Sequence, residues 1–215
     1  MAKIKIQESL GNGFKVIKEN PILIALAILV NLPGALISLK VSNIAQAIPK
    51  SIVALSIVTT LITVFFTGMI VRYIYESREK KPSWGELINF TASRYILLLL
   101  TFLAYTLLTG IGAVLLVIPG IFLLVKLMFC DCGVIIEKLG IIKSLKISWA
   151  VTKGNWWRCF TLAIAVYLPI IVFTFSRTLI PKPIFSMLNF LLGSFTYICY
   201  QSIFTLVYLQ LRKKE

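Results

Sequence analysis

The sequence contains no histidine, and only 8 of its 215 residues are acidic. Histidine is the side chain that most often serves as a general base or a metal ligand, so its absence argues against both kinds of site. Other catalytic signatures are missing too, including a phosphate-binding Walker loop, a GxSxG turn and a zinc motif. We therefore expect a protein that is not an enzyme, has no catalytic residues and needs no cofactor.

Long polar stretches are scarce as well, because 59% of the residues are hydrophobic and the mean hydropathy is +0.93. These values predict an integral membrane protein. A transmembrane helix needs about 20 residues, so we expect a single polytopic membrane domain over residues 1–215 with about six spans. Apolar segments of suitable length lie at 21–39, 51–73, 95–117, 119–137, 157–176 and 184–210.

The formal charge of +14 fits such a topology. Basic residues gather on the cytoplasmic side of membrane proteins. With the N-terminus inside, the outer loops hold only Lys40, Lys50, Arg177 and Lys182 of the 22 basic residues, apart from Lys126 within a span. We predict a multi-pass protein of a prokaryotic plasma membrane with both termini in the cytoplasm. Topology accounts for the charge, so no nucleic-acid partner is expected.

Three amphipathic segments, at 6–17, 82–95 and 140–155, are too charged to span and predict helices that lie at the membrane surface. The blocks SLGNGFKVIKEN (9–20) and SLKISWAVTKGN (144–155) match at 5 of 12 positions. With a diverged middle copy, the chain divides into units at 1–75, 76–136 and 137–215. The predicted fold is all-α, with six transmembrane helices arranged as three parallel repeats of interfacial helix plus helical hairpin.

The hairpin of the middle unit has two possible turns. Ile118, Pro119 and Gly120 form a turn signal between two apolar segments. A turn at residues 110–112, which include two glycines, is the alternative. It makes Pro119 a kink and brings residues 130–132 toward the cytoplasmic surface.

Two runs between residues 115 and 160, LLVIPGIFLLVKLMF and VIIEKLGIIKSLKISWAVTKGNWWRCF, carry a family resemblance. They resemble the membrane domain of some glycerophosphodiester phosphodiesterases and of related stand-alone multi-span inner-membrane proteins. The opening GFKVIKENP is similar to the start of that domain. In the fused relatives the phosphodiesterase chemistry belongs to a separate soluble barrel with catalytic histidines. The resemblance therefore implies a membrane domain without this activity.

Lys126 and Asp131 stand at membrane depth, where ionisable side chains are a functional hypothesis by default. Five residues separate them by about 140° around a helix, so they do not face each other. Lys126 is shallow enough to extend its amine to the outer interface. Asp131 lies deeper, and Tyr105, Asn189 or Gln201 are its possible partners. A structural polar contact, a substrate or proton path and a misplaced helix boundary all remain open.

Cys130, Asp131 and Cys132 are residue types that bind soft metals. On a helix, however, residues two apart point about 200° apart and cannot share one ion. We expect no metal site here and no disulfides, because all four cysteines fall in or beside apolar segments.

A polar strip on the inner side comprises Glu137, Ser144, Ser148, Lys153 and Arg158. Lysine and arginine charge, together with serine hydroxyls, suits anionic lipid headgroups or a phosphorylated metabolite. The alternative is an ordinary surface helix whose Glu137 pairs locally.

Two functions follow. The first is a non-enzymatic membrane protein that acts through contacts with lipids, a protein partner or a second copy of itself, in membrane homeostasis or as a scaffold. The second is a transporter or lipid-translocating component with a polar site around Asp131. A polar cavity that reaches Asp131 and Lys126 favours the second function, and a dry, close-packed bundle excludes it.

Overall fold

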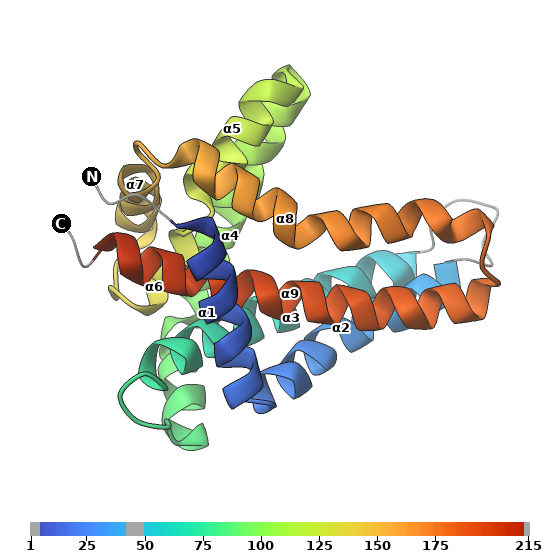
Figure 1. Cartoon of the computed structure of the whole chain (residues 1–215), viewed down its shortest axis with the longest axis horizontal. Coiled ribbons are helices and arrows are strands. Elements are labelled where there is room, and N and C mark those ends of the chain that lie inside the picture. The colour runs from blue at the N-terminus through green and yellow to red at the C-terminus, as the bar shows by residue number, and fades with distance from the viewer. Residues whose placement is uncertain (1–4, 42–49, 213–215) are drawn as a thin grey trace.

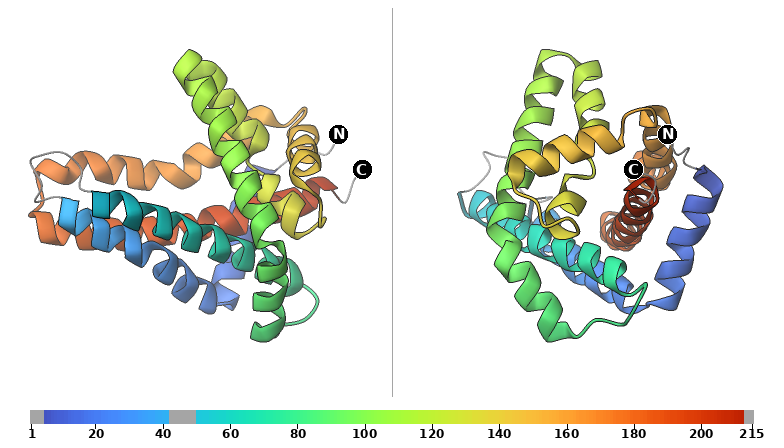
Figure 2. Two further views of the ribbon diagram at one scale, coloured as in Figure 1. Left: turned by 180° about the vertical axis from the view of Figure 1, so that it is seen from behind. Right: turned by 90° about the vertical axis from the view of Figure 1, so that its left-hand side faces the viewer.

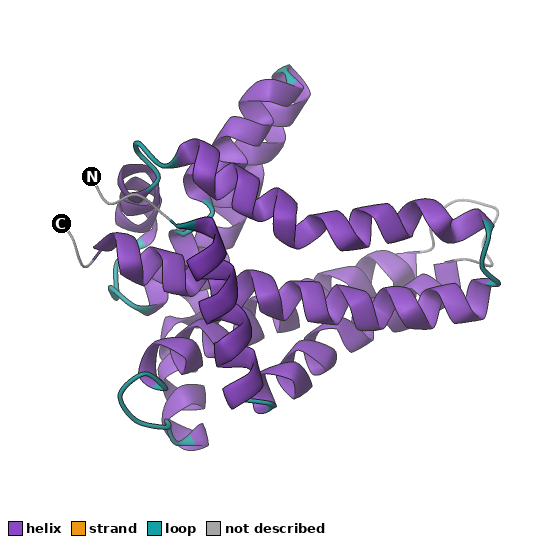
Figure 3. Cartoon of the chain, viewed as in Figure 1, coloured by secondary structure: helices purple, strands orange, loops and turns teal. Residues whose placement is uncertain are grey.

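The computed structural model describes residues 5–41 and 50–212, and the regular structure within these ranges is entirely helical (Figure 3). The elements are α1 (Ile6–Glu19), α2 (Ile22–Val41), α3 (Lys50–Glu76), α4 (Trp84–Leu115), α5 (Val117–Leu127), α6 (Cys130–Ile135), α7 (Ile141–Val151), α8 (Trp156–Phe175), the 3₁₀ turn η1 (Ser176–Thr178) and α9 (Lys182–Arg212).

The long helices α2, α3, α8 and α9 extend side by side to one end of the molecule, whereas α1, α6, α7 and both chain ends lie toward the other (Figures 1 and 2). Helix α9 packs against α1, α2, α3 and α8 and so forms the centre of the fold. Its side chains Ile198, Ile203 and Tyr208 are fully buried.

Apolar side chains also cover much of the outside, as lipid requires. Within the part of the chain that the structure describes, five segments are long and apolar enough to cross a membrane: Val53–Glu76, Trp84–Leu115, Val117–Ile135, Trp156–Phe175 and Ile184–Arg212. The pair formed by α1 and the start of α2 is bent by 93° and adds a sixth only if the two helices are counted as one span. The all-helical prediction is confirmed, and five to six long apolar helices indicate a multi-pass membrane protein.

The hairpin of α4 and α5 turns at Leu116, whose backbone is extended between the two helices. Two glycines let the helices approach closely, because a Cβ on Gly120 would lie 2.7 Å from the Cα of Ala113, and Gly112 faces Gly120. Pro119 therefore lies in the first turn of α5, where its missing N–H has no helical partner to lose. The alternative turn at residues 110–112 is wrong, and the favoured one is displaced by two residues.

This hairpin projects in a different direction from α2, α3, α8 and α9 (Figures 1 and 2). Its tip, residues 114–118, is entirely apolar, and Ile118 is 81% exposed. The sequence segment 82–95 was expected to be a separate surface helix, but α4 runs through it without a break. The reason is local: the run FTASRY at 90–95 contains no glycine, proline or asparagine to end a helix.

The two matching sequence blocks do form similar elements. Each gives a short helix, α1 or α7, followed by a long one, α2 or α8. The aligned Ser9 and Ser144 are both buried, and the aligned Gly13 and Ser148 are both small and buried. Gly13 is needed because a Cβ there would meet Ile203 of α9 at 2.3 Å. The continuous α4 shows that the middle unit departs from this pattern, and the three-repeat architecture stays a prediction.

Candidate functional site

A break between α5 and α6 separates Lys126, at the end of α5, from Asp131, at the start of α6. Helix α5 ends at Leu127 and α6 begins at Cys130, although no glycine or proline interrupts the sequence. Ser148 of α7 bridges the break: its hydroxyl donates to the carbonyl of Lys126 at 2.9 Å and accepts the backbone N–H of Phe129 at 3.0 Å. The two backbone groups freed by the break are thereby satisfied.

Helix α6 also lies close against α7. A Cβ on Gly133 would be 3.0 Å from the Cα of Ser144, and the side chain of Ser144 is fully buried in this contact. Ser144 and Ser148 are thus packing residues between two helices. The prediction that both belong to a headgroup-binding surface strip is wrong.

Asp131 projects from α6 into a cavity of about 250 Å³. One carboxylate oxygen accepts the N–H of Cys132 at 2.8 Å, and the side chain is only half-buried because it borders this space. The cavity lies where α3, α4, α8 and α9 meet the α5–α6 break. Its lining is Thr63, Val64, Thr67, Leu98, Thr101, Phe102, Tyr105, Leu127, Met128, Cys130, Asp131, Tyr167, Tyr197, Tyr200 and Gln201.

Four tyrosines come from three helices to this cavity. Tyr197 shares a hydrogen bond of 2.7 Å with Thr67, which ties α9 to α3. The rings of Tyr167 and Tyr200 lie 5.5 Å apart. Among the described residues that line the space, Asp131 is the single charged side chain, so the cavity presents one carboxylate amid aromatic rings and hydroxyls.

Of the three partners expected for Asp131, Tyr105 and Gln201 line the same cavity, and Asn189 does not. Tyr167, Tyr197 and Tyr200 were missed. A signal existed on α9, since residues 197, 200 and 201 have the i, i+3, i+4 spacing of one helix face. No comparable signal exists for Tyr167, which reaches the cavity from α8.

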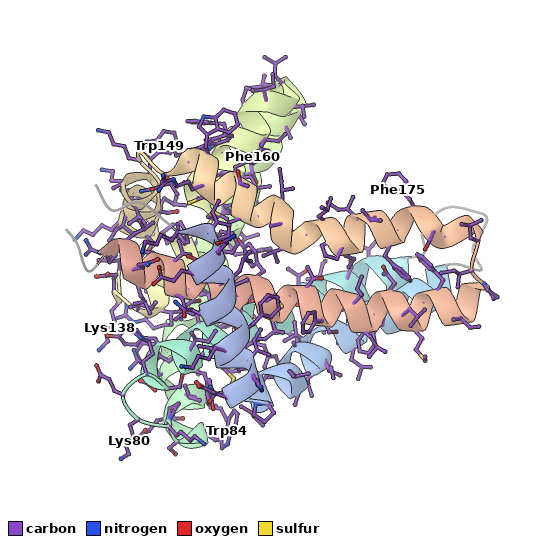
Figure 4. The ribbon with its side chains drawn as sticks, viewed as in Figure 1. Lys80, Trp84, Lys138, Trp149, Phe160 and Phe175 are labelled. Atoms are coloured by element: carbon purple, nitrogen blue, oxygen red, sulfur yellow. The ribbon has the colours of Figure 1, made fainter. Side chains whose placement is uncertain are left out.

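Lys126 lies on a different side of the break and does not line the cavity. Its amine stands 5.2 Å from the ring centre of Trp149 and 5.7 Å from that of Phe122. Trp149 belongs to α7, toward the end of the molecule that holds the chain termini (Figure 4). Because α5 begins at Val117, Lys126 lies about 14 Å along the helix at 1.5 Å per residue. That its amine extends to the outer interface stays a prediction.

Glu137 follows α6 and binds the end of α9. Its carboxylate accepts the Nε–H of Arg212 at 2.9 Å and the hydroxyl of Tyr208 at 3.2 Å. These hydrogen bonds, foremost the one from Arg212, hold the pKa of Glu137 below its usual value. The alternative prediction, that Glu137 pairs locally, is wrong, because both partners come from the end of α9 and are remote in sequence. Lys153 is exposed and Arg158 is half-buried, so the five predicted residues do not form one strip.

The four cysteines are free thiols, and all are buried. Within residues 5–41 and 50–212, no group of three or more Cys, Asp or Glu side chains is placed to hold a metal ion.

A family model described as a domain of unknown function (DUF7847) matches residues 86–211, more than half of the chain. This range contains α5 to α9 and nearly all of α4, hence every lining element of the cavity except α3. No curated protein and no solved structure matches the chain.

Proposed function

The chain belongs to this family of unknown function, and we propose that it is a non-enzymatic membrane protein that binds a small cationic solute beside Asp131. The cavity carries the proposal. A volume of about 250 Å³ lies below the roughly 300–1,000 Å³ of pockets for drug-sized ligands, so it suits a small solute.

The chemistry of the lining favours a cation. Asp131 supplies a negative charge, and no lining residue in the described structure is basic. The faces of Tyr105, Tyr167, Tyr197 and Tyr200 offer the ring quadrupoles that attract ammonium groups. Ionisable residues at membrane depth commonly mark the path of a solute or proton. A role as a transporter component is the activity that uses such a site.

We propose that the protein spans a prokaryotic plasma membrane six times, as three parallel repeats, with both termini cytoplasmic. The support is the distribution of charge and apolar surface. Lys80 and Lys138 lie toward the end of the molecule that holds the chain termini, and Phe175 lies on the arm that extends away from it (Figure 4). In this orientation α1 and α7 are interfacial helices. The resemblance to the phosphodiesterase membrane domain is part of the same proposal.

A scaffold that contacts lipid, a protein partner or a second copy is the other candidate. The observation that favours it is the apolar tip of the α4–α5 hairpin, residues 114–118, where Val114 and Ile118 are more than 80% exposed. This tip does not contribute to the cavity.

Calorimetry on protein in lipid nanodiscs separates the two. We expect choline to bind at least about tenfold more tightly than its uncharged isostere 3,3-dimethylbutanol, since a desolvated cation–π contact contributes about 2 kcal/mol. Asp131→Asn should reduce this preference, because the variant loses the carboxylate charge but keeps the four tyrosine rings. Glu86→Gln, which removes one exposed charge on α4 outside the cavity, is the matched control and leaves it unchanged. If small quaternary and primary ammonium ions bind no better than the neutral isostere, the cavity proposal is wrong.

A further inference from the structure

We propose that Lys126 is the centre of a phosphate-binding site between α5, α7 and α8, separate from the cavity. Lys126 is only 7% exposed. Lys126 takes part in none of the ion pairs found between described residues, so it has no carboxylate partner among them. An unpaired, largely buried ammonium is costly unless an anion accompanies it.

The rings around the Lys126 amine do not supply hydrogen-bond acceptors for its N–H groups. An ammonium has three N–H donors, and the rings of Trp149 and Phe122 attract its charge without offering an acceptor oxygen. Lys126 keeps 7% of its surface exposed, so the site is not fully closed. A phosphate oxygen is the acceptor that suits an ammonium at a membrane interface.

The surroundings are built to hold the headgroup region of a lipid. Phe122 stacks on Trp156, Trp156 stacks on Phe160, and Trp157 packs edge-on against Trp156. The indole N–H of Trp156 donates to the carbonyl of Phe122 at 3.3 Å, which fixes α8 against α5. Figure 4 shows Trp149 and Phe160 on this side of the molecule. Amphipathic aromatic rings are typical of the layer where headgroups lie.

Lys153 adds a second positive charge in the neighbourhood of Lys126. Lys153, in the turn after α7, lies close enough for its charge to act on Lys126. Two like charges that approach each other without a counter-ion are unfavourable, and one bound phosphate relieves this repulsion. From the predicted headgroup strip we place Lys153 at this site, together with Lys126.

Native mass spectrometry of the full-length protein tests the site. Wild-type protein, in detergent with equal amounts of phosphatidylglycerol and phosphatidylcholine, should keep phosphatidylglycerol. Lys126→Gln should weaken this retention about fivefold, the effect of one basic residue at an anionic surface, and Lys126→Arg should preserve most of it. Lys146→Gln is the control, because Lys146 is an exposed lysine on α7, the helix that carries Trp149. Equal retention by wild type and Lys126→Gln, or no preference between the two lipids, would overturn the proposal.

Inorganic phosphate added in excess distinguishes the source of the phosphate. Displacement of phosphatidylglycerol, lost in Lys126→Gln, supports a site that takes a free phosphate group. Retention of the lipid at high phosphate supports a phospholipid headgroup. If Lys126→Gln fails to fold, Lys153→Gln is read instead, and unchanged retention in that variant overturns the proposal. Choline binding in the Asp131 cavity is measured separately, so the two proposals fail independently.

Discussion

Two sides of one helix break differ in how they treat a charged side chain. On the side of α8 and α9, Asp131 borders an open cavity with hydroxyl groups and tyrosine rings around it. On the side of α7, Lys126 lies against the rings of Phe122 and Trp149 and forms no ion pair with another described residue. Both arrangements depend on α6, a helix of six residues held between α7 and α4. The comparison shows that the position of α6, which its contacts with α4 and α7 determine, sets the directions of both Asp131 and Lys126.

The tightest point of this arrangement is Gly133, and the largest effect is expected there. Gly133→Leu inserts a side chain where even a Cβ would lie 3.0 Å from the backbone of Ser144. Overpacking of this kind destabilises by about 1–3 kcal/mol, and we expect the upper end because the obstacle is backbone. Unfolding in mixed micelles measures the loss. Gly140→Leu, at a glycine with no neighbour within 4 Å of its added Cβ, should change stability by less than about 0.5 kcal/mol.

Gly133→Leu also tests whether the two sides of the break depend on the same helix contact. If α7 fixes α6, the variant displaces Asp131 and Lys126 together, so choline binding and phosphatidylglycerol retention both decline. Loss of only one of them would show that the two sides are held independently.

Ser148→Ala should have the next largest effect. The hydroxyl satisfies both backbone groups of the break, and its removal leaves the N–H of Phe129 and the carbonyl of Lys126 buried with fewer partners. Thr152 still approaches the Lys126 carbonyl at 3.4 Å, so we expect a loss of about 1–3 kcal/mol, mainly from Phe129. Ser93→Ala is the control, since Ser93 is exposed and bonds only within its own helix. Equal stability of the two variants would contradict the bridging role.

The sequence predicted the apolar helices well because a span is a local property of about 20 residues. It also predicted Tyr105 and Gln201 beside Asp131. The break after Leu127 escaped prediction because nothing in the local sequence interrupts a helix. It is stabilised by Ser148, which is remote in the chain. Ser144 and Ser148 were predicted at the surface because the sequence does not distinguish their two possible positions. Serine occurs both at a headgroup surface and in a close contact between helices.

The direction in which Lys126 points could not be predicted from the neighbouring sequence, because it depends on where α7 packs. A periodic pattern assigns a residue to a face of its own helix, but it does not say which neighbour covers that face. The tyrosines of the cavity show the same limit. Those on α9 share a helix face that is readable from their spacing, whereas Tyr167 arrives from a helix whose position only the fold provides.

The smallest expected effect lies at the far end of α6, where Glu137 pairs with Arg212. Because hydrogen bonds lower the folded-state pKa of Glu137, the pair stabilises the fold above the ordinary pKa near 4.5 and loses its effect as the pH falls below that value. The pair is partly exposed, so we expect less than about 1 kcal/mol. Between pH 7 and pH 3, the free energy of unfolding should fall more steeply with decreasing pH in wild type than in Glu137→Gln. Glu79→Gln, at an exposed acid, should keep the wild-type slope. If Glu137→Gln keeps that slope too, the end of α9 does not depend on this pair, and the contacts of α6 with α7 and α4 fix the segment that carries Asp131 without it.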